Sequence, residues 1–96
     1  MPSLVNKKAL YQQAMHLFGY DQQLCKLAEK ACELSAEANR MLGHQSLERR
    51  LAGGMADVEI MIEQFRANGL GELIDFQKQQ KLERLAERLG MAYASE

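Results

Sequence analysis

The spacing of apolar residues constrains the fold of this chain more than any other sequence feature. In its third quarter, apolar residues recur at intervals of three or four positions: Leu47, Leu51, Met55, Val58, Ile62 and Phe65. This is the period of an α-helix, and no segment shows the strict alternation of a half-buried strand. The only proline is Pro2, so nothing interrupts a helix further along the chain. The sequence therefore predicts an all-α fold.

Capping and breaking residues divide the chain into four predicted helices. Asp21 and Ser46 are suitable N-caps, while Gly19 and Gly43 are suitable stops. The predicted helices cover residues 3–18, 21–43, 46–68 and 72–90, and the stretch "NGLG" ends the third. The connections are short, so neighbouring helices should pack antiparallel as in a helical bundle. At 96 residues, the whole of 1–96 is expected to form one domain.

A chain of this length has a marginal core, because it buries only about 60–65% of its unfolded surface. Self-association would cover more of its apolar surface. We expect the second and third predicted helices to pair antiparallel and to meet the same pair from a second copy, which gives a four-helix core. The first and last helices would cover the flanks. The sequence leaves open whether the assembly is a homodimer or a tetramer.

Charge and composition limit the other partners and the compartment. The 12 basic and 13 acidic residues give a net charge of −1, which provides no broad surface for nucleic acid or an anionic membrane. No 18 apolar residues run together, and the N-terminus lacks the apolar segment of a signal peptide. Cys25 and Cys32 are too far apart on a helix for a disulfide and are expected to be small core residues. We expect a soluble, cytoplasmic protein.

The residues with chemical potential lie on the second and third predicted helices. Glu29, Glu33 and Glu37 fall on the side of the second helix away from its main apolar stripe, as solvated acids often do. The third helix carries adjacent glycines, Gly53 and Gly54, just before Asp57. An interior glycine costs a helix about 0.5–1 kcal/mol relative to alanine, so helix propensity does not explain the pair.

Two segments taken together resemble a known enzyme family. "FGYDQQLCKLAEKACELSAEANR" followed by "LAGGMADVEIMIEQF" is similar to the MazG-like branch of the all-α nucleoside triphosphate pyrophosphohydrolases. The short single-domain type of phages and other mobile elements comes closest. The resemblance covers most of the chain. It implies a helical fold, Mg²⁺ bound by four carboxylates of the motifs EExxE and ExxD, and cleavage of a nucleoside triphosphate to a monophosphate and pyrophosphate.

The resemblance also implies that the metal site is incomplete. The family's metal ligands are the second and third acids of EExxE and both acids of ExxD. Glu29 matches the first acid, which is not a direct ligand, and Glu33 and Asp57 match two ligands. Lys30 and Gly54 stand where the other two carboxylates are expected. An ammonium group among the remaining acids would repel a dication, so we expect weak or no Mg²⁺ binding.

Two functions follow from this pattern. The first is a catalytically impaired protein that binds a nucleotide or a host protein as a regulatory module and needs no cofactor. In that case Lys30, flanked by Glu29 and Glu37, could bind phosphate as a point charge. The second is an active, Mg²⁺-dependent pyrophosphohydrolase with a rearranged site, in which Glu33 and Asp57 bind the metal with help from Glu37, Glu59 or Glu63.

Overall fold

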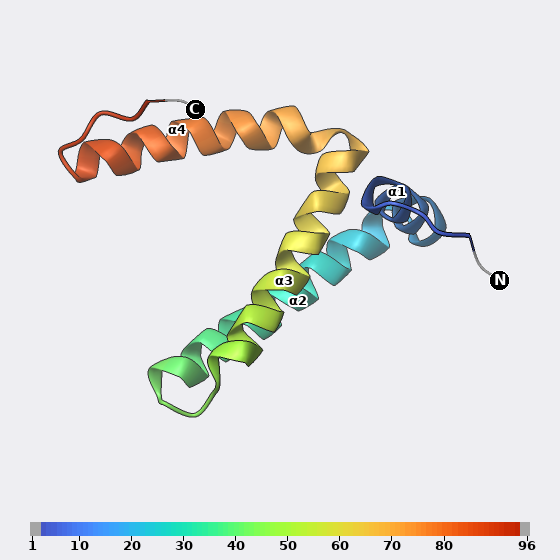
Figure 1. The fold of residues 1–96 in the computed structure, drawn as a ribbon, viewed down its shortest axis with the longest axis horizontal. Coiled ribbons are helices and arrows are strands. Elements are labelled where there is room, and N and C mark those ends of the chain that lie inside the picture. The colour runs from blue at the N-terminus through green and yellow to red at the C-terminus, as the bar shows by residue number, and fades with distance from the viewer. Residues whose placement is uncertain (1–2, 95–96) are drawn as a thin grey trace.

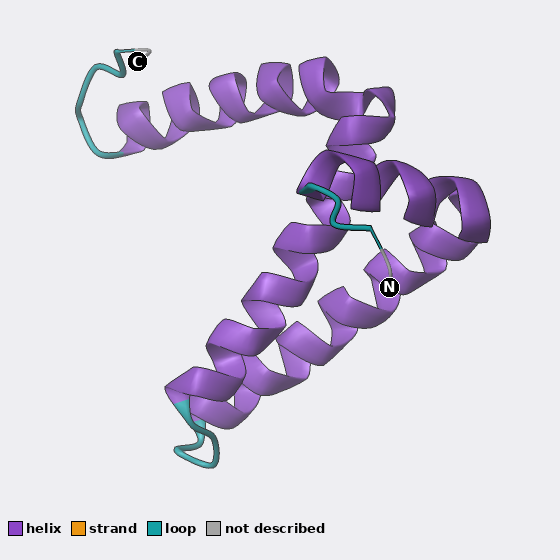
Figure 2. Ribbon diagram, turned by 45° about the vertical axis from the view of Figure 1, so that its right-hand side comes forward, coloured by secondary structure: helices purple, strands orange, loops and turns teal. Residues whose placement is uncertain are grey.

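The computed structural model describes residues 3–94 and is helical, as the apolar spacing predicts. Its elements are α1 (Lys7–Phe18), α2 (Tyr20–Leu42), α3 (Glu48–Phe65), the irregular turn η1 (Arg66–Leu70) and α4 (Gly71–Arg88). Residues 3–94 contain no strand, and Figure 2 shows helices joined by short loops. Within the same range, no helix combines the length and the apolar character needed to cross a membrane.

Three of the predicted helix starts differ from the structure. Asn6 accepts a hydrogen bond from the backbone N–H of Ala9 at 2.9 Å, so α1 begins at Lys7 rather than at Ser3. Asp21 does not cap α2, because the N-cap is Gly19 and Asp21 lies in the first turn. Ser46 lies one residue before the N-cap of α3, and its hydroxyl donates a hydrogen bond to Glu37 of α2. The residue at the N-cap of α3 is Leu47, which makes no side-chain cap.

The centre of the fold is an antiparallel hairpin of α2 and α3, with α1 packed across its open end (Figure 1). The buried apolar residues at this end are Met15, Met61 and Phe65, supported by Leu27 and Leu70. The rings of Tyr20 and Phe65 meet edge to face with their centroids 5.5 Å apart. This small cluster fixes the position of α1 against the hairpin.

The last helix does not cover a flank of its own α2–α3 hairpin, and its predicted place on the flank of a four-helix core of two copies stays a prediction. In Figure 1, α4 leaves the end of α3 and extends away from α1, α2 and α3. The change of direction occurs at Asn68 and Gly69, and Gly69 has a φ of 106°, which a glycine adopts without strain. The chain therefore bends within the stretch "NGLG", where the sequence predicts the end of the third helix, although α3 itself ends at Phe65.

Apolar residues remain exposed on the face of the hairpin that α1 does not cover. On α2 the row consists of leucines and small residues, and Leu42 is 81% exposed. On α3, Met55 and Ile62 are also exposed. Cys25 and Cys32 lie on the exposed surface of α2 as well, so their predicted place in the core is wrong. In a single chain, this face of the hairpin has no covering element.

Candidate functional site

Lys30 lies between the two acids that the metal motifs retain. Its Nζ is 3.5 Å from a carboxylate oxygen of Glu33 and 3.8 Å from one of Asp57. Glu33 comes from the next turn of α2 and Asp57 from the facing turn of α3, so the antiparallel pairing brings these three groups together. The carboxylate of Glu33 raises the pKa of Lys30 above its ordinary value, and the carboxylate of Asp57 raises it further.

This arrangement does not fit a magnesium ion. Mg²⁺ requires oxygen ligands in near-octahedral geometry, usually including carboxylates. The Lys30 ammonium already neutralises Glu33 and Asp57, and Gly54 has no side chain to offer. Among residues 3–94, no group of three or more His, Cys, Asp or Glu side chains is placed to hold a metal ion. The charge that a dication would supply to these acids comes from the lysine.

The two glycines of α3 have different surroundings. A Cβ on Gly54 would lie 3.3 Å from Cδ1 of Leu34, because the Leu34 side chain rests on the glycine backbone. A Cβ on Gly53 would meet no atom within 4 Å. Gly54 therefore allows close packing of α3 on α2, whereas nothing in the structure explains Gly53.

Glu37, the third glutamate of α2, belongs to a separate hydrogen-bonded cluster. It accepts two hydrogen bonds from the guanidinium of Arg40, at 3.0 and 3.1 Å, and one from the Ser46 hydroxyl. The hydrogen bonds from Arg40 and then Ser46 lower the pKa of Glu37 to about 2. These contacts hold Glu37 at the loop end of the hairpin rather than beside Lys30.

The other candidate acids are also held elsewhere. Glu29 forms an ion pair with Lys26 at 3.7 Å on the surface of α2. Glu63 accepts a hydrogen bond from the Tyr11 hydroxyl at 2.6 Å, and Lys7 is 3.5 Å away. The Tyr11 hydrogen bond lowers the pKa of Glu63 and raises that of Tyr11. The structure therefore brings Glu33 and Asp57 together around Lys30, places Glu37 at the same hollow of the hairpin as these two acids, and leaves Glu29 and Glu63 in other ion pairs.

Lys30 and Asp57 form one of two bonded polar pairs that cross the hairpin, and Glu37 and Arg50 lie near each other at the next interval. Along α2 the members follow one another every seven residues, at Gln23, Lys30 and Glu37. Along α3 they follow at the same interval, at Arg50, Asp57 and Gln64. Two turns of helix span about seven residues, so each series lies on one side of its helix. We call these pairs the polar ladder.

Each pair of the polar ladder is chemically matched. The amide of Gln23 donates to the Gln64 side chain at 2.7 Å, and both residues are buried. Lys30 faces Asp57, and Arg50 lies near Glu37, where its charge also lowers the pKa of that acid. In antiparallel helices, a single polar layer can fix the register, since a shifted pairing leaves a buried polar group without a partner.

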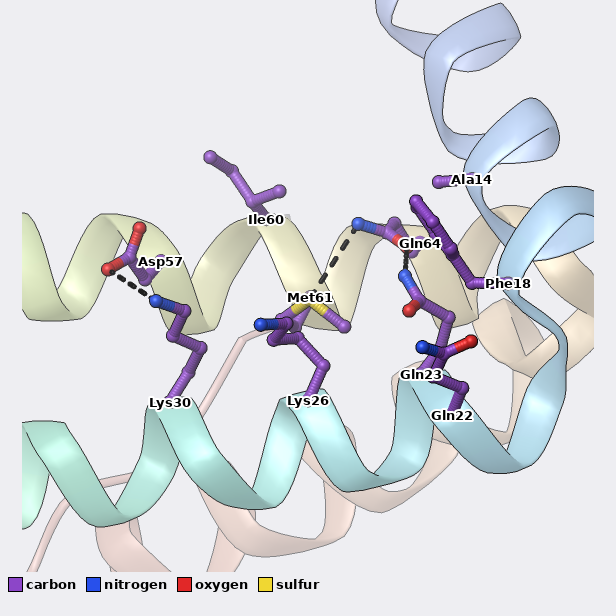
Figure 3. A pocket seen from close by; sticks show the side chains of 10 residues that line it. All are labelled: Ala14, Phe18, Gln22, Gln23, Lys26, Lys30, Asp57, Ile60, Met61 and Gln64. Carbon is purple, nitrogen blue, oxygen red and sulfur yellow. Dashed lines mark hydrogen bonds and ion pairs between the residues drawn. The ribbon is translucent and has the colours of Figure 1, made fainter.

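A groove lies beside the first two pairs of the polar ladder (Figure 3). It has a volume of about 430 Å³ and opens between α1, α2 and α3. Phe18 and Ile60 contribute apolar walls, Lys26 and Lys30 contribute positive charge, and Gln22 contributes an amide. A second hollow of about 380 Å³ lies further along the hairpin. It is lined by the acids Glu33, Glu37 and Asp57 together with Arg40, Arg50 and the two glycines.

Reasoning from the sequence missed Gln23, Gln64 and Arg50. The sequence does contain a pattern that indicates these residues, because polar residues repeat every seven positions within two amphipathic helices. It is separate from the metal motifs, which concern only one pair of the polar ladder. Comparison of the chain with protein-family models, curated proteins and solved structures gives no match. The contacts described above are therefore the basis for the proposals that follow.

Proposed function

We propose that this chain is a MazG-like protein of the nucleoside triphosphate pyrophosphohydrolase fold that has lost metal-dependent catalysis. It acts as a binding or regulatory module, and its ligand is a nucleotide or a host protein. The observation that supports this proposal most directly is the ion pairing of Lys30 with both Glu33 and Asp57. A bound dication would have to displace that ammonium group, and only two carboxylates would then remain to bind it.

The groove beside Lys30 favours a nucleotide over a protein as the ligand. Lysine side chains bind phosphate as point charges, and Lys26 is half exposed at the groove, where Glu29 is its only close acidic neighbour among the described residues. Phe18 and Ile60 present apolar surface to which a base could bind, and Gln22 presents hydrogen-bonding groups. Such binding would be independent of divalent metal.

Metal-free binding can be measured directly. Isothermal titration with ATP and dATP in the presence of EDTA should give binding that Mg²⁺ does not strengthen. Lys26→Ala should weaken it roughly tenfold, since one charged contact to phosphate is lost. The matched control is Lys81→Ala, which removes a lysine from α4, away from the groove. Equal effects of the two substitutions, or no binding by the unaltered chain, would contradict a nucleotide site in the groove.

The alternative is an active pyrophosphohydrolase with a rearranged site. It is supported by the positions of Glu33 and Asp57, whose carboxylate oxygens lie 3.5 and 3.8 Å from the same Lys30 Nζ. Pyrophosphate release from a panel of NTPs and dNTPs, with Mg²⁺ or Mn²⁺, separates the two functions. We expect no release above background. A clear rate that disappears in Glu33→Ala would establish the alternative instead.

A gain-of-binding experiment tests the assignment of the metal positions. The double substitution Lys30→Glu with Gly54→Glu restores the four carboxylates that the resemblance implies. We expect this variant to bind Mg²⁺ in isothermal titration, whereas the unaltered chain does not. Lys26→Glu with Gly53→Glu adds the same charges at neighbouring positions and serves as the control. Equal Mg²⁺ affinity of the two double variants would mean that positions 30 and 54 are not metal positions.

We further propose that the chain self-associates in the cytoplasm through the exposed faces of α2 and α3, which gives a four-helix core in a dimer or tetramer. Leu24 and Leu42 of α2 are exposed, as are Met55 and Ile62 of α3. Small side chains between the two leucines would allow close approach of a second hairpin. Ala38→Glu should dissociate the assembly in sedimentation equilibrium, whereas Glu29→Gln, outside this row, should not.

A further inference from the structure

The helix α4 has no buried residue although it carries several large apolar side chains. Leu73 is 62% exposed, Phe76 58%, and Leu85 and Leu89 are also open to solvent. On an ideal helix these residues form two rows, because Leu73 and Phe76 lie on a different side from Leu85 and Leu89. A helix with apolar residues on two sides usually lies between other elements.

A helix in this position does not gain its stability from the rest of the same chain. Most helical stability in proteins comes from the packing of an apolar face, and isolated helices are marginal in water. The main contacts of α4 are with η1, including the ion pair of Arg66 with Asp75 at 2.7 Å. The described chain therefore provides no packing surface for most of the length of α4.

The exposed surface of the whole chain has the size that an extensive dimer would cover. The accessible surface is 7820 Å², whereas a compact monomer of 10.9 kDa has about 5,600 Å². The difference of about 2,200 Å² is more than twice the roughly 800 Å² that a standard dimer covers on each partner. One contact patch on α2 and α3 would leave much of this surface exposed.

We propose that α4 is an exchanged arm, which packs against the α1–α3 body of a second copy of this chain, while the second copy's α4 packs reciprocally on the first. This inference rests on the proposed self-association and extends its interface beyond the four-helix core. In Figures 1 and 2, α4 extends away from its own body. To fold back, it would have to break the Arg66–Asp75 ion pair and rebuild the bend at Gly69.

The charges of α4 agree with this choice of partner. The helix contains four acidic and four basic residues, Glu72, Asp75, Glu83 and Glu87 against Lys78, Lys81, Arg84 and Arg88. Its net charge is therefore zero, and it has no electrostatic preference for nucleic acid or for a strongly acidic or basic partner. A second copy, with a net charge of −1 and equally exposed apolar faces, matches it.

Hydrogen exchange of the full-length chain, measured across a range of protein concentrations, tests the arm. We expect the amides of α4 to be protected only at concentrations at which the dimer forms. Phe76→Glu and Leu85→Glu should each remove that protection and weaken dimerisation about tenfold or more, because each places a charge in the interface. Gln79→Glu adds the same side chain to the polar flank of α4 and should do neither. Protection of α2 amides in every variant identifies those that are folded.

Each other outcome overturns the proposal in a recognisable way. Protection of α4 in a dilute monomer would mean that it packs on its own body. A dimer in which α4 stays unprotected would mean that α2 and α3 form the whole interface, and self-association would stand without the arm. A monomer at every concentration would overturn both. None of these results bears on metal binding or hydrolysis, which the titration and the pyrophosphate assay test separately.

Discussion

The α2–α3 hairpin and α4 are both built from amphipathic helices of 18 residues or more, yet they differ in how their residues are matched. Among the described residues, the buried polar side chains of the hairpin have partners, as in the pairing of Gln23 with Gln64. In α4, large apolar residues such as Phe76 have no such counterpart in the described chain. The contacts between α2 and α3 are complete within one chain, and those of α4 are not.

This difference shows which part of the chain is specified by itself and which part requires a partner. The polar ladder favours one register of α2 on α3, since a shift of either helix by one turn would separate Gln23 from Gln64 and Lys30 from Asp57. In the described chain, nothing comparable fixes α4 against the body. We therefore expect substitutions of residues buried between α2 and α3 to change the stability of the monomer, and substitutions in α4 to change association.

The largest contrast should come from the two phenylalanines. Phe65 is 3% exposed, so Phe65→Ala should lower the free energy of unfolding by about 3–5 kcal/mol. Phe76 is exposed in the monomer, and Phe76→Ala should change the free energy of unfolding by no more than about 0.5 kcal/mol. Urea denaturation at concentrations that keep the chain monomeric measures both values. Equal losses would show that α4 packs on its own body.

A smaller effect is expected at the buried end of the polar ladder. Gln64→Leu leaves the buried amide of Gln23 without its acceptor and should cost about 1–3 kcal/mol. Gln77→Leu makes the same change on the exposed surface of α4 and should cost less than about 0.5 kcal/mol. The double variant Gln23→Leu with Gln64→Leu should recover part of the loss. Additive costs in the denaturation curves would show that the two amides do not interact.

The adjacent glycines offer a finer test within the hairpin. Gly53→Ala should raise the free energy of unfolding by about 0.5–1 kcal/mol, because its Cβ would meet no neighbouring atom and glycine is a poor helix former. Gly54→Ala should gain less, since Leu34 must move to accept the new Cβ at 3.3 Å. Thermal denaturation of the two variants, side by side, gives the ranking. A larger gain at position 54 would mean that Leu34 does not rest on that glycine.

The smallest effect concerns the dependence of stability on pH. The pKa of Glu37 is lowered from 4.5 to about 2 in the folded chain, so its contribution is present above pH 4.5 and is lost as the pH falls towards 2. Glu37→Gln should therefore flatten this part of the acid unfolding profile. Glu83→Gln on α4 is the matched control. An unchanged profile in Glu37→Gln would show that Arg40 and Ser46 do not stabilise the ionised form.

Much of the hairpin could be predicted from the sequence. The apolar spacing predicts three of the four ends of α2 and α3 to within two residues, and the stretch "NGLG" contains the bend that follows α3, which itself ends at Phe65. The meeting of Glu33 with Asp57 follows from the antiparallel pairing that short connections favour. The sequence predicts an ammonium group at Lys30 among the acids Glu33 and Asp57, and Lys30 forms ion pairs with both.

The cap of α3, the direction of α4 and the exposure of the cysteines could not be predicted from the sequence, because they depend on contacts or backbone angles that the apolar pattern does not determine. Ser46 has the residue type of a helix cap, but the cap position of α3 falls on Leu47 and the Ser46 hydroxyl is directed towards Glu37 of α2. The direction of α4 depends on the backbone angles of two residues, Asn68 and Gly69, which the apolar pattern does not determine. Cys25 and Cys32 resemble core residues in type, yet a single chain has nothing to place over them.

The position of Lys30 has a consequence for how this chain could change over time. An acidic residue at position 30 would remove the ammonium group and leave three carboxylates, at positions 30, 33 and 57, close together without a neutralising cation. A side chain at position 54 would require Leu34 to move by a few tenths of an ångström, whatever residue stands at position 30. Both costs oppose the conversion of this charge cluster into a set of four carboxylates.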